Sequence, residues 1–125
     1  MSTLTVTNIK ATGETASRGV SGVAAAWVSF YTTPSTGIRG SRNVSSLTDQ
    51  GVGSTLINFS NNFATNAGYA ATGGQTTTSG GSVVSTGPTI DGAEQTVSSS
   101  RFLCVNNTGT QDRDYQAASY HGDLA

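Results

Sequence analysis

The sequence predicts an all-β fold, an antiparallel β-sandwich of about seven short strands with a short N-terminal neck. Gly, Ser and Thr supply 53 of the 125 residues, while charged residues supply only 10%, against about 25% in an average globular domain. Short runs of alternating apolar and polar residues are separated by turn-forming residues, and no long helical periodicity occurs. Disorder normally comes with a high net charge, whereas the net charge here is −1.

The chain divides into an N-terminal strand and neck over residues 1–26 and a sandwich domain over residues 27–125. Residues 2–8 alternate polar and apolar and predict a short strand. Residues 12–26 are rich in small side chains and have too little apolar bulk to fold alone. Three copies meeting on an axis could pack Gly, Ala and Val closely, so we interpret this segment as the neck of a homotrimer. A plain linker is the alternative.

Residues 24–49 organise the rest of the domain, since they include the single Trp and an aromatic-rich run. Alternation along a strand places Trp27, Ser29 and Tyr31 on one face and Val28 and Phe30 on the other. The sequence PSTG at 34–37 has the residues of a turn. A strand over 27–31 is therefore predicted to pair with a second strand over 38–47.

The remaining strands are predicted from alternation between turns, at 54–60, 69–71, 82–86, 96–106 and 115–121. The Gly-rich segment 73–81 predicts an exposed hairpin loop, and 106–114 a polar turn. The predicted core comprises Trp27, Phe30, Val44, Ile57, Phe59, Phe102 and Leu103 or its neighbours.

Residues with catalytic or metal-binding chemistry are sparse. The single His121 lies near the C-terminus, no G-x-S-x-G elbow occurs, and the glycine pairs are not followed by a lysine. The single Cys104 cannot form an intrachain disulfide or a multi-cysteine metal site, and we expect it to be a small buried hydrophobe. The acidic residues lack calcium-loop spacing. We expect no enzyme activity, no cofactor and no metal.

The charge and hydropathy patterns also bear on partners. A pI of about 5.6 without a basic cluster argues against nucleic-acid binding. No run of about 18 apolar residues exists, so we expect no insertion into a membrane.

Several segments resemble a module common near the C-termini of bacteriophage tail-fibre proteins, of the type found in podoviruses and in phages of cyanobacteria and marine bacteria. The matching segments are AAWVSFY at 25–31, GIRGSRNVSSLTDQGVGS at 37–54, STLINFSNNFATNAGYAA at 54–71 and DRDYQAASYHG at 112–122. The sequence departs from the pattern in the first turn, TTPSTG, and residues 73–96 do not match.

The resemblance implies a virion protein, a trimeric tail-fibre tip made in the host cytoplasm, that contacts other tail or fibre proteins. It also implies an adhesin that binds a host surface polysaccharide or protein without chemistry of its own. The alternative is a structural fibre-shaft or decoration protein with no receptor contact.

Exposed loops on a rigid scaffold commonly provide binding residues, so we place the receptor site in the two polar loops. The residues expected near the ligand are Gln75, Thr77, Asn107 and Arg113. Their amide, hydroxyl and guanidinium groups suit the hydroxyls or carboxylates of a polysaccharide.

Overall fold

The structure is a computed structural model that describes residues 2–9, 12, 18–19, 23–76, 95–106 and 109–125. Within these ranges the regular elements are strands and no helix occurs, as predicted. Two small antiparallel pairs flank the main body. They are β1 (Asn8–Ile9) with β2 (Arg18–Gly19), and β9 (Val105–Asn106) with β10 (Gly109–Thr110).

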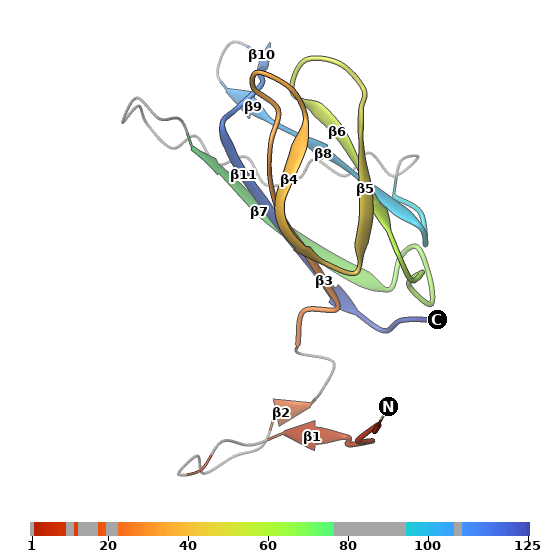
Figure 1. Ribbon diagram of the computed structural model, residues 1–125. Coiled ribbons are helices and arrows are strands. Elements are labelled where there is room, and N and C mark those ends of the chain that lie inside the picture. The colour runs from red at the N-terminus through yellow and green to blue at the C-terminus, as the bar shows by residue number, and fades with distance from the viewer. Residues whose placement is uncertain (1, 10–11, 13–17, 20–22, 77–94, 107–108) are drawn as a thin grey trace.

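Two antiparallel sheets form the body, which confirms the predicted β-sandwich (Figure 1). The four-stranded sheet has the order β4-β3-β11-β7. Its strands are β3 (Ala26–Tyr31), β4 (Gly37–Arg42), β7 (Tyr69–Thr76) and β11 (Tyr115–Gly122). The three-stranded sheet has the order β5-β6-β8. Its strands are β5 (Val44–Asp49), β6 (Ser54–Phe59) and β8 (Ser99–Leu103).

The chain passes from one sheet to the other at Asn43. The predicted single strand over 38–47 is therefore wrong: β4 ends at Arg42 and β5 begins at Val44 in the other sheet. Asn43 has a φ of 55°, in the left-handed region that Asn adopts more readily than most residues. Its side-chain oxygen accepts a 2.8 Å hydrogen bond from the backbone N–H of Asn61. Asn43 thus adopts the backbone conformation that turns the chain, and its side chain stabilises the turn.

Three further strand boundaries differ from the prediction. The strand predicted over 96–106 is interrupted at Cys104, whose backbone N–H and carbonyl bond to Gly53 and Gln111 instead of continuing the β8 ladder. The loop predicted from residue 73 begins too early, because β7 continues to Thr76. The N-terminal strand is only Asn8–Ile9. The strand predicted at 82–86 lies outside the described residues, as does most of the neck.

Aromatic rings fill the space between the sheets. Phe30 of β3 meets Phe102 of β8 edge-to-face, with 5.3 Å between ring centroids. A second cluster joins the rings of Phe59, Phe63, Tyr69 and Tyr120. The pairs of Phe59 with Phe63, Tyr69 and Tyr120 are edge-to-face, whereas Phe63 stacks on Tyr69. Ring quadrupoles favour edge-to-face and offset-stacked pairs.

The predicted core is confirmed for five side chains, namely Phe30, Val44, Ile57, Phe59 and Phe102. Leu103 is only partly buried, while its neighbours Phe102 and Cys104 are buried. Trp27 was wrongly placed in the core: 41% of it is exposed, whereas Val28 and Phe30 are buried. The alternation was correct, but the core lies on the other face of β3.

Candidate functional site

The outer face of the four-stranded sheet displays side chains in rows set by the strand register. Trp27 of β3 lies opposite Ser119 of β11, and Ser119 lies opposite Thr72 of β7. The next outward-facing row has Ser29, Ala117 and Gly74 at the same three strands. Cross-strand partners point to the same face of a sheet. A row of small residues therefore lies beside a row that contains the indole ring.

This arrangement produces a shallow hollow of about 360 Å³, which we call the outer groove. The groove is lined by the outward-facing residues Trp27, Ser29, Thr72, Gly74, Ala117 and Ser119, together with residues 28, 73 and 118. The hydroxyls of Thr72 and Ser119 are hydrogen-bonded at 2.9 Å. The groove thus combines one large ring, a floor without bulky side chains, and a few hydroxyls.

Glycines of β4 allow the rings to lie against the sheet. A Cβ atom at Gly40 would lie 3.5 Å from the indole of Trp27, so the ring is in contact with this position. The ring of Tyr31 covers Gly37 so closely that a Cβ there would collide with it. The two rings are four residues apart on β3, a separation of about 13 Å along a strand.

A second aromatic group, the tyrosine–arginine cluster of Tyr31, Arg39 and Tyr115, lies beyond the row of small residues. Arg39 comes at the irregularity in the β3–β4 register. Its guanidinium lies 5.0 Å from the ring centre of Tyr31 and 4.5 Å from that of Tyr115. It also donates a 2.9 Å hydrogen bond to the backbone carbonyl of Asp114. Cation–π contacts and this bond hold the guanidinium in place at the surface.

Of the residues predicted to bind a receptor, Gln75 and Arg113 are described, and neither lines the outer groove. Gln75 is not in an exposed loop: it is buried in β7 on the inner face of the sheet. Its side-chain nitrogen donates a 2.9 Å hydrogen bond to the carbonyl of Val105, and the Cys104 thiol donates to its side-chain oxygen. Thr77 and Asn107 lie outside the described residues. The structure therefore assigns Gln75 a packing role, and receptor contact by Thr77 and Asn107 stays a prediction.

Arg113 lies in the turn before β11 and is partly buried. Its backbone N–H donates to the hydroxyl of Thr32 at 2.9 Å, and its carbonyl accepts from the N–H of Thr32 at 3.0 Å. Burial raises the pKa of the Cys104 thiol, and the charge of the nearby Arg113 partly opposes this rise. The fold thus brings Gln75 and Arg113 together around Cys104. Contact between Arg113 and a receptor stays a prediction.

Sequence reasoning did not identify Trp27 and its neighbours as a site, although one signal was present. The set Trp27, Ser29 and Tyr31 mixes rings with a hydroxyl, whereas Val28 and Phe30 are purely apolar. A mixed set is typical of an exposed face of an antiparallel sheet, and a purely apolar set of the buried face.

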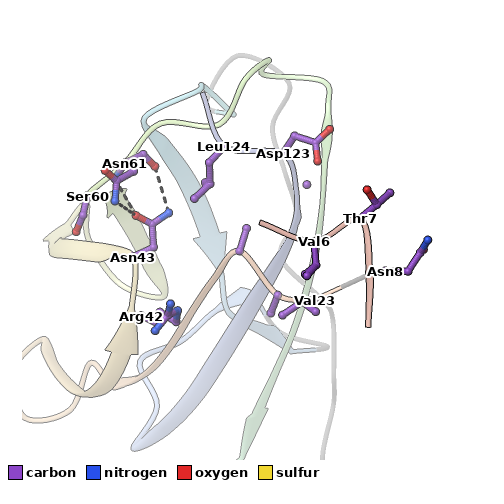
Figure 2. A pocket seen from close by; sticks show the side chains of 13 residues that line it. Val6, Thr7, Asn8, Val23, Arg42, Asn43, Ser60, Asn61, Asp123 and Leu124 are labelled. Carbon is purple, nitrogen blue, oxygen red and sulfur yellow. Dashed lines mark hydrogen bonds between the residues drawn. The ribbon is translucent and has the colours of Figure 1, made fainter. Parts of the chain in front are cut away.

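A second hollow, of about 870 Å³, lies between the N-terminal segment and the end of the sandwich (Figure 2). Val6 and Val23 face it from the N-terminal segment, and Leu124 faces it from the C-terminus. On its other side are Arg42 and the hydrogen-bonded pair Asn43 and Asn61. This hollow, which we call the base pocket, is open and has a mixed lining without a group of convergent reactive side chains.

The described part of the chain has neither a metal-binding cluster nor a membrane-spanning helix. His, Cys, Asp and Glu side chains form no group of three or more that could hold a metal ion there. No helix of these residues is long and apolar enough to cross a membrane. No family model, curated protein or solved structure matches this chain.

Proposed function

We propose that this chain is a bacteriophage tail-fibre module that binds a host cell-surface glycan and catalyses no reaction. The sequence resemblance given above motivates the first part of the proposal. The outer groove is the observation that supports glycan binding. A sugar ring presents C–H groups on its faces and hydroxyls at its edge, so it is bound by an apolar ring beside hydrogen-bonding groups.

The outer groove offers this combination in one place. Trp27, in the groove, is 41% exposed, and Tyr115, beyond the row of small residues, is 44% exposed, so both rings have surface left for a ligand. The hydroxyls of Ser29, Thr72 and Ser119 can donate to and accept from sugar hydroxyls. Binding sites of this size generally combine aromatic walls with a few placed polar groups.

We further propose that the protein forms a homotrimer within the virion. The trimer is assembled through the N-terminal segment and contacts other tail or fibre proteins. The support is apolar surface that the single chain leaves uncovered. Leu4, Val6 and Val23 are 84%, 42% and 50% exposed, and Leu124 is 43% exposed. Val6, Val23 and Leu124 gather around the base pocket (Figure 2). Clustered apolar surface of this kind is commonly covered by association.

A structural fibre protein without a receptor is the second candidate. The row of small residues in the outer groove favours it, since small side chains allow another sheet to approach closely. In that case Trp27 would be buried between subunits, and its removal would change assembly and not adhesion.

The test is adsorption of the purified chain to host cells and to polysaccharide isolated from them. We expect Trp27→Ala to lower the affinity at least tenfold, which is about 1.4 kcal/mol, with the oligomeric mass unchanged. Val52→Ala is the control, because Val52 is an exposed apolar residue (62%) in the turn between β5 and β6, away from this sheet. Unchanged adsorption with a lower mass for Trp27→Ala would support the structural fibre protein. Failure of the parent chain to adsorb would reject the adhesin.

A further inference from the structure

We infer that the outer groove is specific for an anionic polysaccharide, whose acidic groups pair with Arg42 and Arg39 while a sugar ring packs on Trp27. This inference rests on the proposed function and deepens it by naming the class of ligand. The shared chemistry is an oxyanion on the polymer, either a carboxylate or a phosphate.

The charge of the four-stranded sheet is the first support. Its strands contain Arg39 and Arg42 but no Asp or Glu. The chain as a whole has a net charge of −1, so the excess of positive over negative charge on the strands of this sheet is a local feature. A patch of one sign on a surface attracts a ligand of the opposite sign and speeds its association.

The positions of the two arginines are the second support. Arg42 lies opposite Trp27 in the register of β4 and β3 and is exposed. Arg39 lies at the other side of the row of small residues, held between Tyr31 and Tyr115. The guanidinium of Arg39 is thus held against two rings, and Arg42 is the cross-strand neighbour of Trp27, at the side of this sheet that borders the base pocket. A charged sugar could bind with its ring on the aromatic side chain and its oxyanion on the guanidinium.

Arg42 is the stronger anion partner because the guanidinium of Arg39 already contacts two rings and a carbonyl. Asp114 directly precedes Tyr115 of β11, and its backbone carbonyl already accepts a hydrogen bond from Arg39. The acid nearest in sequence to the other end of β11, Asp123, lines the base pocket together with Arg42. Asp49 lies on the other sheet and accepts hydrogen bonds from the N–H of Gly51 and the hydroxyl of Thr36. Asp112 accepts from the N–H of Gly53. These contacts hold Asp49 and Asp112 to other parts of the fold.

The same charges argue against self-association through this face. If two copies packed outer groove against outer groove, their arginines would approach one another without an acid from the same sheets between them. Like charges brought together at an interface oppose binding. An anionic ligand is favoured over a second copy for the same reason.

The experiment measures equilibrium binding of the full chain to host surface polysaccharide in three forms: untreated, carboxyl-reduced and dephosphorylated. We expect one of the two treatments to lower the affinity at least tenfold and so to identify the oxyanion. Arg42→Gln should lower the affinity for the untreated polymer about tenfold and weaken its dependence on salt. Arg39→Gln should have a smaller effect. Arg101→Gln is the matched control, because Arg101 is in β8 of the other sheet; its affinity should equal that of the parent.

Three outcomes would overturn the inference, and they differ in what they leave standing. If both treated polymers bind as well as the untreated one and Arg42→Gln has no effect, while Trp27→Ala abolishes binding, the ligand is a neutral glycan and the proposed adhesin stands. If Arg101→Gln weakens binding as much as Arg42→Gln, the effect is one of overall charge. If no form of the polymer binds the parent chain, the proposed function itself fails.

Discussion

The two faces of the four-stranded sheet have the same strands and the same alternation, yet they differ completely in exposure. On the inner face Val28, Phe30 and Tyr120 are at most 1% exposed. On the outer face Trp27 and Tyr115 are more than 40% exposed. The difference is set by the second sheet, which covers only the inner face. Alternation therefore divides residues into two sets, and the packing partner decides which set becomes the core.

The largest effect that would test this contrast is expected from Phe30→Ala. Phe30 is fully buried and packs edge-to-face on Phe102 of the opposite sheet. Loss of a buried phenyl ring leaves a cavity and costs about 3–5 kcal/mol. Urea unfolding of parent and variant would measure this loss, provided that the slope with denaturant is unchanged.

Trp27→Ala is the counterpart on the outer face and removes a larger side chain. We expect it to reduce the free energy of unfolding by only about 1 kcal/mol, because the ring is 41% exposed and lies on the outer face of the sheet, against Gly40. The same urea experiment measures both variants. A loss as large as that of Phe30→Ala would show that the indole is buried, either in the core or between subunits.

Much of this fold could be predicted from the sequence because several of its strands, such as β3, β6 and β11, alternate between more buried and more exposed residues. The strands predicted at 54–60 and 115–121 match β6 and β11 to within one residue, and the turn glycines Gly51 and Gly53 have the positive φ that marks a tight turn. The sheet change at Asn43 could not be seen, because one residue in a left-handed conformation does not alter the hydrophobic pattern. Phe63 is buried although it lies in the polar segment between β6 and β7, where no periodicity marks it.

The candidate site was less accessible to sequence reasoning, for a different reason. The outer groove exists because small residues of β3, β7 and β11 lie in one row. The register between strands that are distant in sequence cannot be predicted from a local sequence pattern. Gln75 shows the converse. Its Gly-rich surroundings predicted a loop, but the pairing of β7 with β11 extends the strand, and hydrogen bonds to Val105 and Cys104 satisfy the buried amide.

Tyr120→Phe tests the inner face through pH. Burial raises the pKa of the Tyr120 hydroxyl well above its ordinary value, and the Ser100 hydroxyl partly opposes this rise. The folded state therefore holds the Tyr120 proton more tightly than the unfolded state does. This contribution to the free energy of unfolding is fully present below about pH 10, the ordinary pKa of tyrosine, and it is lost as the pH rises further. The variant lacks the ionisable group, so its stability should fall less at alkaline pH.

Near neutral pH the same variant should differ from the parent by less than about 1 kcal/mol, since only one hydroxyl is removed. Thermal unfolding at pH 7 and at pH 11 gives both values. Some alkaline loss should persist, because burial also raises the pKa of Tyr69 and Cys104. Identical pH dependence of parent and variant would mean that the pKa of Tyr120 is not raised in the folded state.

The smallest effect on stability is expected from Gly74→Val, and its comparison with Gly122→Val separates the two faces most sharply. A Cβ atom at Gly74, on the floor of the outer groove, would meet nothing within 4 Å. A Cβ at Gly122 would lie 2.6 Å from the Cβ of Tyr69 and 2.8 Å from the carbonyl oxygen of Gly68. Gly74→Val should therefore raise the free energy of unfolding by about 0.5 kcal/mol, because glycine weakens a strand and a β-branched residue favours it. Gly122→Val should lower it by about 1–3 kcal/mol through overpacking.

If the groove binds the glycan, Gly74→Val should also lower the affinity while the protein becomes more stable. Urea unfolding together with polysaccharide binding measures both properties, and a Gly74→Val protein that binds as tightly as the parent would place the ligand elsewhere on the molecule.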